Sequence, residues 1–96
     1  MMEHKLPILY SRADPKQRRA VREQYVREQH GLCYWCDQPL AGPAAEHVRK
    51  KKINWRLFPK GFTKHPVHLQ HNHDTDLTEG AVHAICNAVM WQYHGR

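Results

Sequence analysis

The fold of this chain is decided by residues 68–87, which read HLQHNHDTDLTEGAVHAICN. The stretch ends in His83-x-x-Cys86, and an earlier knuckle supplies Cys33-x-x-Cys36. Two residues between the members of each pair is the spacing that lets thiolates and an imidazole share one tetrahedral zinc ion. Because this assignment uses all three cysteines of the chain, we predict a structural zinc on Cys33, Cys36, His83 and Cys86. The alternative is a set of buried thiols without metal.

The composition predicts that the fold needs a stabilising element besides its hydrophobic core. The chain has 96 residues, of which 41% are hydrophobic, and so short a chain buries only a small core in a single domain. Three cysteines are too few, and odd in number, for a disulfide framework. We therefore expect a reducing, intracellular location. No segment has the length and apolarity of a signal peptide or a transmembrane span, so no membrane partner is expected.

The charge of the chain predicts a polyanionic partner. The formal net charge is +6, and each cation that neutralises a phosphate releases counterions. The alternative is a basic domain that is merely soluble. Cations are concentrated in residues 47–64, where they alternate with Trp55, Phe58 and Phe62, a pattern typical of nucleic-acid contacts, although a small core could bury those rings instead. The residues predicted to contact DNA are Arg49, Lys50, Lys51, Lys52, Arg56, Lys60 and Lys64.

Residues 14–96 are expected to form one α+β domain, preceded by an arm at residues 1–13, which show no periodicity. Asp14 and Pro15 predict the start of a helix, because aspartate caps the first amides and proline is tolerated in the first turn. Gly31 predicts its end. The charged outer face of such a helix is usually only solvated, so phosphate contacts by its arginines are the less favoured alternative.

A β-hairpin and a closing helix are expected after the basic insertion at 47–64. Apolar and polar residues alternate over residues 67–73, and turn signals at residues 74–76 and at Gly80 indicate two short strands around a turn. Helical spacing then predicts a helix that begins near Cys86 and stops at Gly95.

Residues 68–87 resemble the HNH endonucleases of the phage recombination endonuclease VII type. The core of that family reads D-H-D-H-x-T-G-x-x-x-G-x-x-C-x-x-C-N, and an earlier CxxC pair belongs to its pattern. The matching run in this chain, in register and without a gap, is Gln70, His71, Asn72, His73, Thr75, Gly80, His83, Cys86 and Asn87. The close resemblance covers residues 68–87 together with the earlier Cys33-x-x-Cys36 pair.

The resemblance implies a small zinc-stapled ββα-metal (His-Me finger) domain that hydrolyses DNA phosphodiester bonds. His71 would be the general base, a role that suits an imidazole of near-neutral pKa. Gln70 and Asn87 would surround a catalytic divalent ion, Mg²⁺ or Mn²⁺ with Ni²⁺ as a further candidate, which would stabilise charge on the phosphate and on the leaving 3′ oxygen. His73 would orient the scissile phosphate, with His68 as a helper.

The resemblance also implies a phage or prophage source and therefore the cytoplasm of a bacterial host cell. Relatives of the endonuclease VII type act as resolvase dimers through extra helices, for which this chain is too short. A monomer that nicks double-stranded DNA and leaves a 5′ phosphate is the simpler expectation, and a dimer stays open.

Two positions depart from the family pattern. His83 stands where the family has a cysteine, which is compatible with zinc because Cys₃His sites are ordinary. Gln70 stands where the family has an acidic metal ligand, and its neutral amide attracts a hard cation less than a carboxylate does.

The change at Gln70 leaves several readings open. A carboxylate of Asp74, Asp76 or Glu46 takes over, or the two amides hold the ion together with the DNA phosphate, or catalysis has been lost. A second-ranked assignment makes Glu46 the metal ligand and His47 the base.

Two rival functions remain beside the nuclease. A catalytically degenerate, zinc-stabilised module would only bind DNA through residues 49–64, and Gln70 favours that reading. A small zinc protein would instead recruit a partner through Trp91 and Tyr93 at the end of the last helix.

Overall fold

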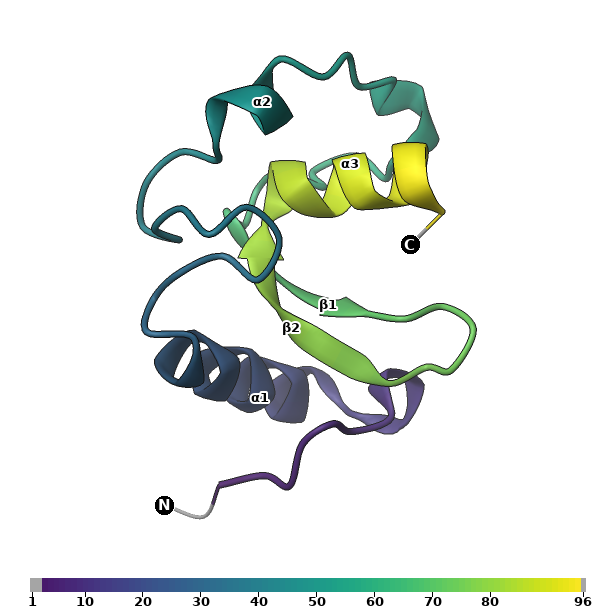
Figure 1. Ribbon diagram of the computed structural model, residues 1–96. Helices are drawn as coiled ribbons and strands as arrows, with labels where there is room; N and C mark the ends of the chain where they lie inside the picture. Colours follow the sequence, from purple (N-terminus) through teal and green to yellow (C-terminus); the bar gives the residue numbers. More distant parts are fainter. Residues whose placement is uncertain (1–2, 96) are drawn as a thin grey trace.

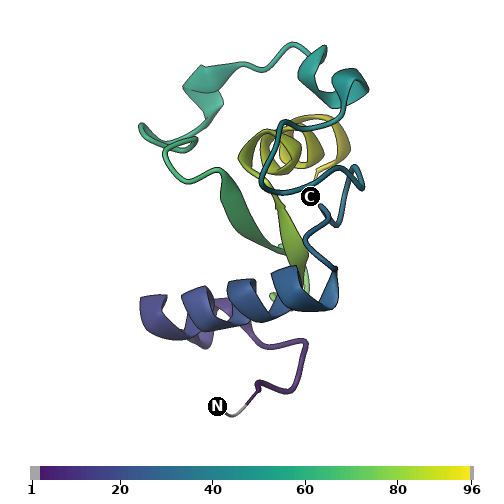
Figure 2. The ribbon, with the colours of Figure 1, turned by 90° about the vertical axis from the view of Figure 1, so that its left-hand side faces the viewer.

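The computed structural model describes residues 3–95, which fold around a two-stranded antiparallel hairpin. The helices and strands are, in chain order, η1 (Tyr10–Arg12), α1 (Pro15–Glu28), α2 (Glu46–Arg49), η2 (Trp55–Leu57), β1 (Val67–His71), β2 (Thr78–His83) and α3 (Ala84–His94). Figure 1 shows the hairpin between α1 on one side and α3 on the other, and the turned view of Figure 2 agrees. The α+β class expected from the sequence is confirmed.

Helix α1 begins where its capping signal predicts. Asp14 is the N-cap, and its Oδ1 accepts a hydrogen bond from the Gln17 amide at 2.7 Å. The helix ends at Glu28, somewhat earlier than predicted. His30 and Gly31 have φ angles of 56° and 76°, and left-handed backbone of this kind terminates a helix.

The register of the hairpin contains one irregularity, between Gln70 and His71. Pairing between β1 and β2 is regular from Val67 to Gln70 and then shifts, so that His71 lies opposite Thr78. A bulge of this kind redirects the side chain at the irregularity.

Strand β1 ends at His71 rather than continuing to residue 73 as the alternation predicted. Asn72 folds the chain into a turn, because its side-chain oxygen accepts hydrogen bonds from the amides of Asp74 at 2.8 Å and Thr75 at 3.1 Å. The turn therefore begins one residue after His71.

Gly80 lies inside β2 and not in the turn that it was expected to mark. A Cβ at this position would lie 2.8 Å from both Gln29 Oε1 and Tyr34 Cγ. Gln29 also bridges to the strand, since its Nε2 donates to the Ala81 carbonyl and its Oε1 accepts from the Ala81 amide, each at 2.9 Å. Glycine is needed here because the segment after α1 is packed directly on β2.

Helix α3 follows β2 without a loop. It begins at Ala84, two residues before the predicted start at Cys86, with His83 as its N-cap. Gly95 ends it with a φ of 68°, as predicted. The inner face of α3 is buried at Cys86, Ala88, Val89 and Met90, and it forms the core together with the knuckle and β2.

The described part of the predicted arm, residues 3–13, is docked on the rest of the molecule. Ile8 and Thr78 exchange backbone and side-chain hydrogen bonds, with the Thr78 amide donating to the Ile8 carbonyl at 3.0 Å. The Tyr10 amide donates to the Asp76 carbonyl at 2.8 Å, and the Ser11 hydroxyl donates to the Asp76 carboxylate at 2.5 Å. Met1 and Met2 lie outside the described residues. The segment thus runs beside β2 and brings Tyr10 to the hairpin.

The basic insertion at residues 47–64 arches over α3, as Figures 1 and 2 show. Gln92 fastens it, because its Oε1 accepts from the Asn54 amide at 3.0 Å and its Nε2 donates to the Lys52 carbonyl at 3.1 Å. The Tyr93 hydroxyl donates to the same carbonyl. Among the described residues, no helix has the length and apolarity to cross a membrane.

Candidate functional site

The four predicted metal ligands meet at one buried point. The side chains of Cys33, Cys36, His83 and Cys86 are all buried, and their ligand atoms lie within 4.8 Å of one another. Within residues 3–95 this is the only group of three or more histidine, cysteine and acidic side chains that is close enough to share a metal ion. The group can hold a metal ion, and its composition fits a structural zinc site.

The imidazole of His83 is oriented as a ligand. Its Nδ1 faces the thiols, 3.5 Å from Cys36 Sγ and 3.6 Å from Cys86 Sγ. Its Nε2 lies 2.9 Å from the Pro39 carbonyl and 3.1 Å from the Gly42 carbonyl. Two acceptors require a proton on Nε2, which leaves the Nδ1 lone pair free for a metal, as is usual for histidine ligands.

The knuckle geometry explains why Cys33 and Cys36 converge. The Cys33 amide donates to the Gln38 carbonyl at 2.9 Å, and the Asp37 amide donates to the Cys33 carbonyl at 3.0 Å, closing a tight loop with Asp37 at a φ of 63°. The Cys86 thiol, hydrogen-bonded to Cys33, lowers the pKa of the Cys33 thiol. The same contact raises the pKa of the Cys86 thiol, so the two sulfur atoms share one proton. A thiolate is the form that binds metal, and a bound cation would be needed for both to be thiolates.

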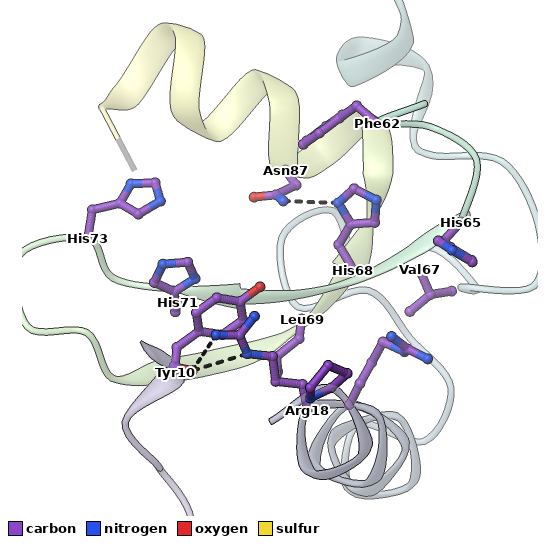
Figure 3. A pocket seen from close by; sticks show the side chains of 12 residues that line it. Tyr10, Arg18, Phe62, His65, Val67, His68, Leu69, His71, His73 and Asn87 are labelled. Atoms are coloured by element: carbon purple, nitrogen blue, oxygen red, sulfur yellow. Dashed lines mark hydrogen bonds between the residues drawn. The ribbon is translucent and has the colours of Figure 1, made fainter. Parts of the chain in front are cut away.

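A second site lies on the other side of β1. We use the name histidine pocket for a cavity of about 480 Å³ between the start of α1, β1 and α3 (Figure 3). Three of its lining residues, His71, His73 and Asn87, were predicted to be catalytic. Its polar and aromatic lining consists of Tyr10, Arg18, Arg22, Phe62, His65, His68, His71, His73 and Asn87.

His71 is held between aromatic neighbours. The Tyr10 ring stacks on it with a centroid separation of 3.9 Å and an angle of 6°, and the His73 ring meets it edge-on at 4.7 Å. Burial, followed by the charge of His73, lowers the pKa of His71. His71 is therefore neutral at physiological pH and can accept a proton.

Asn87 is oriented by His68, the predicted helper. Asn87 Nδ2 donates to His68 Nδ1 at 3.1 Å, and burial lowers the pKa of His68, which keeps its ring neutral as the acceptor. Figure 3 shows the Asn87 side-chain oxygen on the other side, toward His73. That oxygen is available to a ligand, and amide oxygens are donors that hard cations accept.

Gln70 does not line the histidine pocket. Its side chain is 1% exposed, its Nε2 donates to the His71 carbonyl at 2.9 Å, and its Oε1 is buried without a hydrogen-bond partner among the described residues. The Gln70 side-chain amide therefore stabilises the backbone of His71 from the interior of the protein.

The carboxylates proposed as substitutes for an acidic ligand lie elsewhere, since no acidic residue lines the histidine pocket in the described chain. Asp76 accepts hydrogen bonds from Ser11, and Glu46 pairs with Lys50 at 3.2 Å. His47, the base of the second-ranked assignment, lines a separate cavity. The structure does not bring Glu46 or His47 to Asn87.

The cations closest to the candidate chemistry are Arg18 and Arg22 of α1, which were only the less favoured phosphate contacts. Both line the histidine pocket, and Arg18 donates to the Tyr10 carbonyl while its Cζ lies 3.9 Å from the Tyr10 ring centroid. None of the predicted DNA contacts from the basic insertion lines this pocket. All of those side chains are exposed; they are Arg49, Lys50, Lys51, Lys52, Arg56, Lys60 and Lys64.

Neither Tyr10 nor the two arginines stood out in the sequence as site residues. Tyr10 is brought to His71 by backbone pairing between segments more than sixty residues apart. The one available signal was the position of Arg18 and Arg22, which are four residues apart and therefore on one face of a helix. No family model, curated protein or solved structure matches this chain.

Proposed function

We propose that this protein is a zinc-stapled, metal-dependent DNA endonuclease of the ββα-metal class that hydrolyses phosphodiester bonds in the histidine pocket. The observation that carries the proposal is the convergence of His71, His73 and Asn87 with two arginines in one cavity. A neutral imidazole can take a proton from water, and an amide oxygen can hold a cation. Guanidinium groups can bind the phosphate.

Each side chain has a role that follows from its chemistry. Arg18 and Arg22 bind the phosphate, because guanidinium groups match phosphate oxygens. His73, whose ring meets the His71 ring edge-on, orients the phosphate. His71 takes a proton from a water molecule whose oxygen forms the new bond to phosphorus, while the bond from phosphorus to the 3′ oxygen breaks. The leaving 3′ oxygen takes a proton from solvent, and the 5′ phosphate stays on the other product.

Asn87 Oδ1 is the residue atom that would hold the catalytic cation, with the imidazole of His73 and the DNA phosphate as further ligands. When bound, the ion supplies Lewis-acid stabilisation of the charge on the phosphate and the 3′ oxygen. Since the pocket offers imidazole and amide donors in place of carboxylates, Mn²⁺ or Ni²⁺ is favoured over Mg²⁺.

In this proposal the Cys₃His group binds zinc and has a structural role. A zinc ion there would join the knuckle to the junction of β2 and α3, and so would fix the start of the helix that carries Asn87. A phage or prophage source, with action as a monomer in a bacterial cytoplasm, is the setting that the sequence resemblance supports.

A supercoiled-plasmid nicking assay tests the proposal. Zinc-loaded protein is incubated with Mg²⁺, Mn²⁺, Ni²⁺ or EDTA, beside His71→Ala and the control His47→Ala. We expect metal-dependent nicking that is lost in His71→Ala and kept in His47→Ala. Loss in His47→Ala alone would move the catalytic centre to the second-ranked assignment.

A catalytically degenerate DNA-binding module is the second candidate, favoured by the absence of a carboxylate from the described lining of the histidine pocket. Binding of plasmid DNA without nicking under all three metals would select it. A protein that binds no DNA would contradict both candidates.

A further inference from the structure

A second cavity opens beside the histidine pocket. We use the name aromatic trough for this space of about 290 Å³ lined by Leu57, Phe58, Pro59, Phe62 and Trp91 together with His73 and Asn87. Phe62, His73 and Asn87 line both cavities. The trough is therefore continuous with the place where the scissile phosphate is proposed to bind, and Figure 3 shows Phe62 beside Asn87 and His68.

The side chains of the trough are partly open to solvent. Trp91 is 41% exposed and Leu57 is 49% exposed, while Phe58 and Phe62 are half-buried. Phe58 contacts Phe62 at a centroid separation of 4.8 Å and Trp91 at 5.4 Å. Exposed aromatic clusters in a small monomer mark binding surfaces.

The charge beside the trough points to the kind of ligand. Arg56, Lys60 and Lys64 are exposed on the same segment that carries Phe58 and Phe62. Alternation of aromatic faces with cations suits single-stranded nucleic acid, in which the phosphates meet the cations and the bases stack on the rings. An apolar peptide would gain nothing from these cations.

We propose that the aromatic trough stacks an unpaired nucleobase of DNA next to the phosphate held in the histidine pocket. This inference rests on the proposed function and names its substrate class, which is DNA with an unpaired base beside the scissile bond. A base in an intact duplex must first leave its stack, at a cost in free energy that an already unpaired base does not meet. Stacking on aromatic rings tolerates any base, so the selectivity is for structure rather than sequence.

The experiment measures binding without cleavage. A single-stranded oligonucleotide containing 2-aminopurine, whose fluorescence falls on stacking, and the same strand in a full duplex are titrated with zinc-loaded protein without a second metal. We expect tighter binding of the single strand, with quenching of its fluorescence. Trp91→Ala should weaken single-strand binding by at least about fivefold, because stacking contributes about 1–3 kcal/mol per base, and should change duplex binding by less than about twofold.

Two further variants control for folding and for general loss of aromatic surface. Tyr34→Ala removes a ring with a similar exposed fraction, 44% against 41% for Trp91, and Tyr34 lines neither the trough nor the histidine pocket, so this variant should leave the single-strand preference unchanged. Trp91→Phe keeps an aromatic face and should retain most of the quenching. If Trp91→Ala loses zinc or secondary structure, Phe58→Ala replaces it.

The outcomes separate this inference from the nuclease proposal. Nicking that depends on His71, combined with equal single-strand and duplex affinity or no effect of Trp91→Ala and Phe58→Ala, overturns the trough alone. Stacking that depends on Trp91, without cleavage under any metal, supports the trough as a base-binding site and overturns its link to a scissile bond. Failure to bind either DNA overturns both.

Discussion

The ring of Tyr10 lies flat on the ring of His71, with centroids 3.9 Å apart and an angle of 6° between the planes. The guanidinium group of Arg18 lies over the Tyr10 ring, with its Cζ 3.9 Å from the ring centroid. The base of the proposed reaction is thus fixed by a residue from a distant part of the chain, which has no proton-transfer role of its own.

Tyr10→Ala should lower kcat for DNA nicking by about 10- to 100-fold, because a misplaced reacting group is costly even when its chemistry is intact. The substitution also exposes His71 to water and should raise its pKa toward the ordinary value of about 6.5. Tyr10→Phe keeps the stacked ring and should retain both properties. NMR titration of His71 beside the nicking rate measures the effect; a kcat drop without movement of the His71 pKa would argue against a positioning role.

The nicking rate should stay constant as pH falls through about 6.5, the ordinary histidine pKa, and should decline only at lower pH. Burial and the charge of His73 lower the pKa of His71, so the base remains deprotonated in the range where a free histidine gains its proton. His73→Ala removes the like charge and should shift the pKa of His71 upward, which NMR titration reports even if this variant is inactive. A rate that already halves near pH 6.5 in the wild type would contradict the assignment of His71.

Replacement of His83 separates metal binding from the hydrogen bonds of its ring. His83→Ala should lose stoichiometric zinc and unfold, because zinc binding of about 10–16 kcal/mol is of the order of the whole stability of a small domain. His83→Cys restores a four-ligand set and should bind zinc, yet be less stable by about 1–3 kcal/mol, since the Pro39 and Gly42 carbonyls lose their donor. Zinc analysis and urea unfolding test this; a folded, zinc-free His83→Ala protein would show that the group needs no metal.

Gly80→Ala should destabilise the fold by about 1–3 kcal/mol, the range for overpacking. Its Cβ would lie 2.8 Å from Tyr34 Cγ and from Gln29 Oε1. Gly42→Ala is the matched control, because the nearest atom to its Cβ is 3.8 Å away and it should cause little change. Urea unfolding of the zinc-loaded variants measures the difference, and equal effects of the two substitutions would mean that the segment after α1 yields easily.

The ends of the helices and the hairpin could be predicted from the sequence, because each depends on residues that are close together in the chain. Asp14 and Gly95 were predicted as the ends of helices from capping chemistry alone, and the hairpin was predicted from alternation. The predicted end of β1 was wrong because the Asn72 side chain accepts hydrogen bonds that bend the chain after His71. The predicted place of Gly80 in the turn was wrong because this glycine is needed inside β2, where a Cβ would meet Gln29 and Tyr34.

The sequence by itself determined which four residues form the group that can hold a metal ion, because short spacing within each of its two pairs allows little freedom. It also determined that His71, His73 and Asn87 were candidates. Only the tertiary structure decided what surrounds them. It brought Tyr10, Arg18 and Arg22 into the histidine pocket, turned Gln70 into the interior, and left the cations of the basic insertion outside. The reason is that residues 3–13 dock through backbone pairing with a hairpin more than sixty residues away in the chain, and no local residue pattern encodes such pairing.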